Sequence, residues 1–460
     1  MIGRNVELNT LNEAYNQDVG TICVLYGRES MGKTTLLNEY TKDKQSLWFY
    51  ALPGSEKEQK RHFIHAVTAQ TNRALMTFAE PDDSYEQLIF NALRQMSGRV
   101  VLVIEDFIHL VKASDSFFDD IIKVVSSDTL NVRLQVILTT SSIYFVENNL
   151  VAAVGSAAMH INSFIKLREF SFVETVRMFP QYGVEDIVRL YAITGGVPGN
   201  LASFMPQRSL KDNILNEILM PDGKMHLAGY EFVKNELRET GVYNTILAAL
   251  ASGREKLNDI YEYTGYGRDK ISVYLKHLME RDVVEKLFSY DSKGYVNSRK
   301  GLYRINDSYV YFWYRFIYGQ FTALTCMGAE RFYERFIQDE LKKYASDAFV
   351  MVAQEYLELL GNAGGLPFKI VRKGSWYGKN GNVDIIAEGA DGSCLIGQSN
   401  STDKPMTRTD YEKLLANAEL AGISFQYVYL FSLGGFAEEL RTLSEKNMEI
   451  TIKLIGMEDL

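Results

Sequence analysis

A glycine-rich segment near the N-terminus carries the residue types best suited to chemistry. It reads G-x-x-x-x-G-K-T, follows a short apolar run at residues 22–26 and precedes a helical pattern. Glycines let such a loop curl so that backbone N–H groups face phosphate oxygens, a lysine neutralises phosphate charge, and a hydroxyl binds Mg²⁺. We therefore expect ATP and Mg²⁺ to bind here. The expected cofactor-binding residues are Gly27, Gly32, Lys33, Thr34 and Thr35.

An acidic pair follows a second apolar run. Residues 101–104 read VLVI and lead directly into Glu105 and Asp106. At such a strand end one carboxylate completes the Mg²⁺ shell with Thr34, and the next orients the attacking water. The usual order is Asp then Glu, whereas this chain has Glu105 first. The longer side chain then lies on the metal and the shorter one near the water, so we expect nucleotide binding to persist and hydrolysis to be slow.

Two further apolar runs complete a predicted parallel sheet. Residues 134–138 lead into the polar run 139–142, where Ser141 is a candidate to hydrogen-bond the γ-phosphate or its water. Residues 47–51 form another strand. Strands that alternate with helical stretches predict a parallel sheet with helices on both faces. The fold class is therefore α/β, beginning with a nucleotide-binding sheet.

Five motifs in order carry a resemblance to a known family. They are Gly3-Arg4 with Glu7-Leu8, the phosphate loop, IEDF, ILTTSS and ITGGVPGNL. In this order they resemble an archaeal-type P-loop ATPase of the STAND/AAA-related superfamily. The resemblance implies that the N-terminal G-R and the G-G-x-P turn cup the base and ribose. The residues so implied are Gly3, Arg4, Gly195, Gly196 and Pro198.

One departure from that family concerns arginine. After the third strand the family often has an arginine pair near the γ-phosphate, whereas residues 155–159 here read GSAAM. An arginine finger contributes orders of magnitude to the rate where it acts. Together with the inverted acidic pair, its absence indicates a weak ATPase or a nucleotide-gated switch.

The middle of the chain has the pattern of a winged helix. Helical periodicity at 242–251, 257–264 and 268–281 precedes two strand-like runs within 283–305. In a DNA-binding version the third helix enters the major groove, but such modules also pack domains together, and both readings stay open. The DNA-contact candidates are Arg268, Lys270 and Lys276 on the third helix and Lys293, Arg299 and Lys300 on the wing.

An aromatic run follows at residues 302–320. Its side chains could stack on bases, but the helical spacing of Phe312, Trp313, Phe316 and Ile317 favours core packing.

The C-terminal region has a second α/β pattern. It extends over 345–460, with strands predicted near 368–372, 382–387, 393–397, 426–431 and 449–455. The family resemblance implies that this region is similar to a PD-(D/E)xK nuclease that has lost its active site. Asp384 matches the expected Asp, but Gln398 and Asn400 replace the Glu and Lys, and Val350 stands where the helix carboxylate is expected. Because Mg²⁺ needs clustered carboxylates, we expect no nuclease activity.

Length, charge and cysteine content limit the remaining classes of protein. At about 100–200 residues per domain, 460 residues form several domains. A net charge of −9 argues against coating nucleic acid by bulk charge. Three scattered cysteines exclude a disulfide framework and, with no apolar span or signal peptide, predict a cytoplasmic protein without a membrane segment. The expected domains are ATPase 1–205, helical lid 206–238, winged helix 239–310, helical connector 311–344 and nuclease-like 345–460.

Two functions from different classes fit these observations. The first is a slow ATPase that acts as a nucleotide-dependent switch on nucleic acid. The second is a non-enzymatic regulatory or scaffold protein, stabilised by nucleotide, that contacts a protein partner or another copy of itself.

Overall fold

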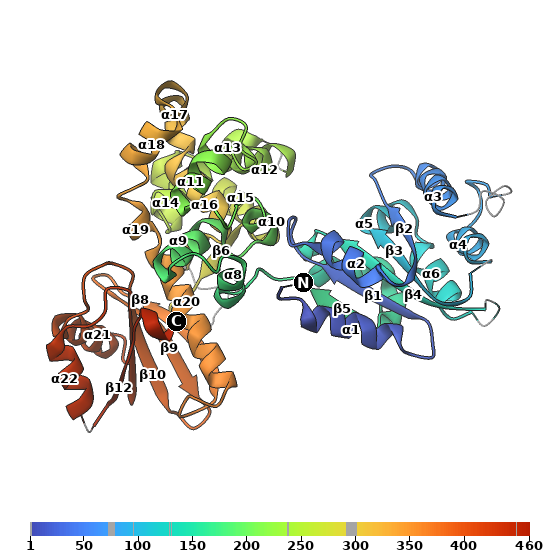
Figure 1. Ribbon diagram of the computed structural model, residues 1–460. Coiled ribbons are helices and arrows are strands. Elements are labelled where there is room, and N and C mark those ends of the chain that lie inside the picture. Colours follow the sequence, from blue (N-terminus) through green and yellow to red (C-terminus); the bar gives the residue numbers. More distant parts are fainter. Residues whose placement is uncertain are drawn as a thin grey trace. The chain divides into compact units, whose positions relative to one another are not determined.

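A computed structural model describes residues 2–71, 79–94, 96–127, 129, 131–236, 239–290, 301–447 and 449–460. Lys293, Arg299 and Lys300 lie outside these residues. The chain divides into two compact units, Met1–Glu169 and Phe170–Leu460 (Figure 1). Among the described residues, no helix combines the length and apolar character needed to cross a membrane.

A five-stranded parallel sheet forms the centre of the first unit. Its strand order is β2-β3-β4-β1-β5, and every neighbouring pair is parallel. This confirms the predicted parallel sheet, while the short edge strand β5 has no counterpart in the sequence prediction. The strands are β1 (Thr21–Tyr26), β2 (Gln45–Tyr50), β3 (Gly98–Glu105), β4 (Val132–Thr140) and β5 (Ser163–Lys166).

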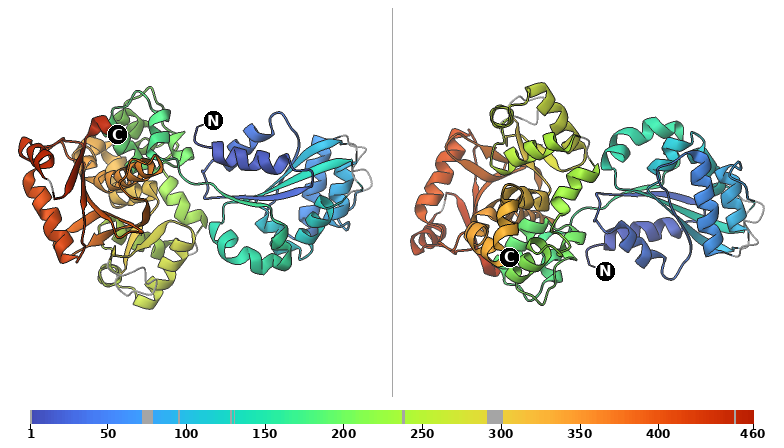
Figure 2. Two further views of the ribbon diagram at one scale, coloured as in Figure 1. Left: turned by 90° about the horizontal axis from the view of Figure 1, so that it is seen from below. Right: turned by 90° about the horizontal axis from the view of Figure 1, so that it is seen from above.

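Helices cover both faces of this sheet (Figure 2). Apolar residues of β1, β3 and β4 are buried against them, which removes the strands from water on both sides. The helices are α1 (Asn5–Tyr15), α2 (Lys33–Thr41), α3 (Glu56–Gln70), α4 (Tyr85–Leu93), α5 (Ile108–Ala113), α6 (Phe117–Val125) and α7 (Leu150–Val154), with a π-helical turn at Phe145–Asn149 and a 3₁₀ turn at Gly155–His160.

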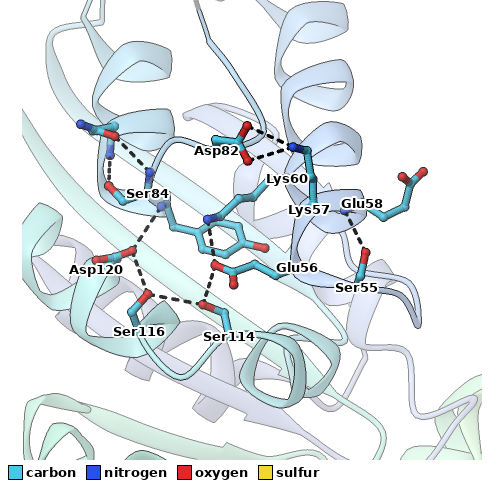
Figure 3. Close-up of polar contacts among 12 residues, drawn as sticks. Ser55, Glu56, Lys57, Glu58, Lys60, Asp82, Ser84, Ser114, Ser116 and Asp120 are labelled. Atoms are coloured by element: carbon cyan, nitrogen blue, oxygen red, sulfur yellow. Dashed lines mark hydrogen bonds and ion pairs between the residues drawn. The ribbon is translucent and has the colours of Figure 1, made fainter.

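A partly buried polar network ties α3 to the loop between α5 and α6 (Figure 3). The Glu56 carboxylate accepts from Lys60 Nζ at 2.8 Å and from Ser114 Oγ at 2.9 Å. Asp120, only 3% exposed, accepts from the backbone N–H of Tyr85 at 3.2 Å. Because buried charges are costly unless paired, these contacts hold α3 and α5 in one arrangement, and α5 begins just after the acidic pair.

The second unit begins with helices and continues into three helices and a hairpin. Helices α13, α14 and α15 precede β6 and β7, which pair antiparallel. The elements up to the hairpin are α8 (Phe172–Met178), α9 (Val184–Thr194), α10 (Pro198–Leu201), α11 (Leu210–Asn213), a π-helical turn (Ile214–Leu219), α12 (Ala228–Glu236), α13 (Thr240–Ala251), α14 (Leu257–Thr264), α15 (Arg268–Glu280), β6 (Val284–Leu287) and β7 (Leu302–Ile305).

The aromatic run after the hairpin belongs to the core. Phe312, Trp313, Phe316 and Ile317 are each at most 5% exposed, which confirms the packing prediction over base stacking. They lie in or just after α16 (Ser308–Phe316), and a 3₁₀ turn (Tyr318–Gln320), α17 (Phe321–Met327), α18 (Ala329–Phe336) and α19 (Leu341–Tyr344) follow.

A mixed five-stranded sheet ends the chain. Its order is β12-β11-β10-β9-β8, with β8, β9 and β10 antiparallel and β10, β11 and β12 parallel. Alternate residues face different layers: Leu395 belongs to the cluster that includes α20, and Ile396 to the cluster of α21 and α22. The elements are α20 (Ser346–Asn362), β8 (Ile370–Tyr377), β9 (Asn382–Gly389), β10 (Cys394–Asn400), α21 (Arg408–Leu420), β11 (Tyr427–Ser432), α22 (Glu438–Lys446), β12 (Thr451–Ile455) and a closing 3₁₀ turn (Met457–Asp459).

Candidate nucleotide site and a carboxylate cluster

The phosphate loop joins β1 to α2 and depends on its two glycines. A Cβ on Gly27 would lie 2.7 Å from the carbonyl oxygen of Leu167, which no side chain permits. Gly32 caps α2 with φ at 82°, a left-handed conformation that favours glycine. Nothing lies within 4 Å of a Cβ built there. The loop therefore leaves open space at the N-terminus of a nine-residue helix, where backbone N–H groups favour anions.

Lys33 opens this helix and bends back over the loop. Its Nζ donates to the carbonyl oxygen of Gly27 at 2.6 Å and to that of Arg28 at 2.9 Å. Burial lowers the pKa of the Lys33 ammonium, and the carboxylates of Asp106, Glu29 and Glu105 oppose that shift. The lysine thus lies among three negative charges, in a position to neutralise phosphate.

Thr34 and the acidic strand meet directly. Thr34 Oγ1 donates to Glu105 Oε2 at 2.8 Å, although 71 residues separate them. This contact arises because β3 lies two strands from β1 in the sheet, so their carboxyl ends share one edge. A hydroxyl and a carboxylate side by side are oxygen ligands of the kind Mg²⁺ prefers.

Asp106 follows Glu105 in a sharp turn. Its φ is 52°, which Asp tolerates better than most residues. The turn is held by the N–H of Phe107, which donates to the carbonyl oxygen of Thr139 at 3.0 Å. A hydrogen bond to Asp106 raises the pKa of Tyr50 to about 12. Asp106 therefore has a phenol partner at the end of the neighbouring strand β2.

Ser141 follows β4, the strand between β3 and β1. The register pairs Tyr26 with Thr140, so the residues after β4 lie beside the start of the phosphate loop. The carbonyl oxygen of Ser141 accepts from the N–H of Ile143 at 3.1 Å. The structure thus brings the serine to the edge that holds the loop and the acidic pair.

The residues implied by the family resemblance lie in two places. Gly3 has a φ of 64°, and Arg4 is 4% exposed, with Nη2 donating to the carbonyl oxygens of Met31 at 3.1 Å and Arg168 at 2.9 Å. Thr35 lies in the first turn of α2. Gly195, Gly196 and Pro198 belong to the second unit, where Gly195 ends α9 and Pro198 opens α10. Their contact with a nucleotide stays a prediction.

The candidate DNA-contact residues on α15 each have a partner within the chain. Arg268 Nη2 donates to Asn258 Oδ1 at 2.6 Å and its guanidinium lies 4.3 Å from the Tyr261 ring centroid. Lys270 Nζ lies 3.6 Å from a Glu239 carboxylate oxygen, and Lys276 Nζ lies 3.8 Å from one of Glu280. All three basic side chains are nevertheless exposed at the surface.

The nuclease-like motif forms a self-contained cluster on β9 and β10. Asp384 Oδ2 accepts from Gln398 Nε2 at 2.6 Å and from both the backbone N–H and the hydroxyl of Ser399 at 3.1 Å. Asn400 Nδ2 donates to the carbonyl oxygen of Lys404 at 2.7 Å. Burial raises the pKa of the Asp384 carboxyl, the hydrogen bonds from Ser399 oppose this, and the charge of Asp347 adds to it. Within the part of the chain that the structure describes, no three acidic, histidine or cysteine residues are placed to hold a metal ion.

Sequence reasoning missed four residues at these two sites: Arg28, Glu29, Tyr50 and Asp347. Arg28 and Glu29 lie inside the phosphate loop, whose variable positions carry no motif. Tyr50 ends β2, next to β3 in the sheet, and the rule that parallel strands share a carboxyl edge could have found it. Asp347 lies in the first turn of α20, three residues before Val350, the position where a nuclease-like domain is expected to have a carboxylate.

Comparisons with known proteins agree with this geometry. Residues 1–204 match a family described as an ATPase domain predominantly from Archaea, and residues 313–399 match a family of archaeal and bacterial proteins of unknown function. An uncharacterized protein of Methanocaldococcus jannaschii is 24% identical over 387 residues, which are 84% of this chain and 84% of the relative.

A walker-type ATPase of Pyrococcus abyssi has a similar fold, with a TM-score of 0.51 at 15% identity. The likeness covers 68% of this chain and 96% of that one, so it extends beyond the first unit. The family match supports nucleotide binding. Residues 1–204 are therefore similar to an archaeal-type ATPase domain, and residues 313–399 are similar to a family without assigned function.

Proposed function

We propose that the chain binds ATP with Mg²⁺, hydrolyses it slowly and acts as a nucleotide-dependent switch. The observation that carries this proposal is the contact of Thr34 with Glu105 beside Lys33. In the proposed roles Lys33 neutralises the β- and γ-phosphates, Thr34 and Glu105 hold Mg²⁺, and Asp106 orients the attacking water. Ser141 would bond the γ-phosphate or that water.

The residues present fit a bound nucleotide with its metal. The space beside Gly32 lies at a helix N-terminus, and the adjacent oxygen donors suit a hard divalent cation. Bound Mg²⁺ neutralises phosphate charge. The chain's own part is to place the Asp106 carboxylate beside the Tyr50 hydroxyl, whose pKa it raises. A short, fixed aspartate has less reach than a glutamate, which supports slow turnover.

Nucleic-acid contact is the second half of the proposal. Helices α13–α15 followed by the β6–β7 hairpin have the element order of a winged helix. Exposed Arg268, Lys270 and Lys276 on α15 would contact phosphates. The C-terminal sheet would act as a nuclease-like platform without nuclease chemistry, because hydrogen bonds from Gln398 and Ser399 engage Asp384.

A scaffold is the second candidate function, and the pairing on α15 favours it. Arg268, Lys270 and Lys276 each contact a partner within the chain. Nucleic acid would have to compete with those partners, whereas a protein partner or another copy of this chain would not need to. In this alternative, nucleotide stabilises the first unit and the second unit makes the contacts.

ATP turnover by the purified chain, with and without DNA, tests the proposal. We expect slow phosphate release that DNA accelerates and that Lys33→Ala and Asp106→Asn abolish. Lys276→Glu should weaken DNA binding and lower its salt dependence, while Lys57→Ala, which removes an exposed lysine paired with Asp82, should change neither. Nucleotide binding with turnover insensitive to DNA would instead support the scaffold.

A further inference from the structure

The last residues of the first unit lie against the phosphate loop. The N–H of Leu167 donates to the carbonyl oxygen of Tyr26 at 2.7 Å, and the carbonyl oxygen of Leu167 occupies the space that a Cβ on Gly27 would need. Two residues later, at Glu169, the chain leaves this unit and enters the next. The link between the units therefore starts beside the loop proposed to hold the nucleotide.

An ion pair joins this link to the loop itself. Arg28, the second residue of the phosphate loop, donates through Nη2 to Oε1 of Glu169. Their side chains are 12% and 33% exposed, so the pair is partly removed from water and less screened than a surface pair. Glu169 is thus held by a residue that the proposed ligand would sit beside.

A second arginine holds the same segment independently. Arg4 donates to the carbonyl oxygens of Met31, inside the loop, and of Arg168, inside the link. Both acceptors are backbone carbonyl oxygens and the donor is the buried Arg4 side chain. This contact therefore does not depend on the Arg28–Glu169 pair. Loss of the ion pair should therefore loosen the link without unfolding it.

Lys33 connects the nucleotide position to Arg28. Its Nζ donates to the carbonyl oxygens of Gly27 and Arg28. An ammonium has three donors, so one is left for phosphate, and bonding both the β- and γ-phosphates must displace one of these two contacts. A polyphosphate in the loop also brings negative charge toward the Arg28 guanidinium, where it competes with the Glu169 carboxylate.

We infer that the Arg28–Glu169 ion pair is the element through which nucleotide binding loosens the link between the two units. This inference rests on the proposed function and names how that site is regulated. Nucleotide draws Arg28 and Lys33 toward phosphate, Glu169 is released, and the second unit gains freedom relative to the first. The nucleotide shifts this equilibrium only by the difference in its affinity for the two states.

Fluorescence energy transfer in the full chain tests the inference. Cys326 is exposed, and the other two cysteines are buried, so one native thiol takes a dye. Val19→Cys, at a residue 63% exposed in the first unit, supplies the second thiol. A non-hydrolysable ATP analogue with Mg²⁺ should shift the transfer efficiency. Glu169→Gln should show most of that shift without nucleotide and respond to nucleotide at least twofold less.

Three controls separate the possible causes. Glu169→Asp keeps the charge and should behave as the parent chain. Glu58→Gln removes an exposed pair with Arg61 in the same unit and should leave the shift unchanged. Nucleotide affinity, measured with a fluorescent ATP analogue, should rise in Glu169→Gln, because the carboxylate that competes for Arg28 is gone.

Each contrary result has a distinct meaning. A parent-like response in Glu169→Gln would overturn the inference. So would a parent chain that binds nucleotide without a shift, although the proposed function would then survive. A parent chain that binds no nucleotide would overturn the proposed function itself.

Discussion

The two five-stranded sheets both place carboxylates on strands at a polar edge, but they surround these carboxylates differently. At the edge of the first sheet, Glu105 accepts a hydrogen bond from the Thr34 hydroxyl and lies near Lys33. In the C-terminal sheet, one oxygen of Asp384 receives three hydrogen bonds from Gln398 and Ser399. A carboxylate that its own chain solvates has little capacity left for a metal. The first edge can therefore bind a charged group from outside the chain, whereas the carboxylate of the second edge is already satisfied by hydrogen bonds within the chain.

Removing the lysine of the first edge should have the largest effect. Lys33→Ala deletes a charge-assisted contact to phosphate, so ATP affinity should fall on the order of 100-fold. Titration with a fluorescent ATP analogue measures this, and Lys57→Ala, an exposed lysine in the same unit, is the matched control. An affinity within threefold of the parent chain would mean that Lys33 does not contact phosphate and that the first edge, like the second, is satisfied by contacts within the chain.

The acidic pair should separate binding from turnover. Asp106→Asn keeps the side-chain shape but removes the base, so turnover should fall about 100-fold or more while affinity changes little. Tyr50→Phe removes only the hydroxyl that holds Asp106, so turnover should fall about fivefold. Single-turnover phosphate release measures both. Equal losses in the two variants would show that the phenol does more than hold the carboxylate.

Which residues meet at the first edge can be predicted from the sequence because they lie at the ends of predicted strands. The loop, the acidic pair and Ser141 each follow an apolar run, and parallel strands bring such ends together whatever the chain length between them. Arg28 escapes this reasoning, because an arginine within a loop has no fixed role, and Tyr50 can be placed only once β2 is known to lie beside β3. Their roles come from which strand lies beside which, and from where the link returns.

The second edge is harder to predict because it depends on side-chain pairing rather than on a backbone motif. Replacement of Glu and Lys by Gln398 and Asn400 indicates lost metal chemistry, but not that the amide of Gln398 would donate to Asp384. The strand β8 of the C-terminal sheet is also longer than the predicted strand at 368–372. It runs to Tyr377, since residues 374–377 pair with β9 although their sequence, GSWY, has no apolar alternation.

Restoring a carboxylate at the second edge should destabilise it. Gln398→Glu places a second negative charge where an amide now donates to Asp384 at 2.6 Å, so the free energy of unfolding should fall by about 2 kcal/mol at pH 7. Lower pH should recover part of the loss, since one carboxyl then takes a proton. Urea unfolding followed by tryptophan fluorescence measures this. Asn382→Asp, an exposed amide-to-acid change on the neighbouring strand β9, should cost far less. Equal costs would show that Gln398 is no special partner of Asp384.

The smallest effect should come from removing the native charge of Asp384. Burial raises the folded pKa of this carboxyl above its ordinary 3.8. Folding therefore favours the protonated form, and the stability this provides is complete below the unfolded pKa and lost as pH rises through the folded one. Asp384→Asn cannot titrate, so its urea midpoint relative to the parent chain should improve from pH 4 upward and level off above the folded pKa of Asp384. A gap that narrows with rising pH would mean that Asp384 is favoured as an anion. The second edge would then resemble the first, with a carboxylate held ready for a cation.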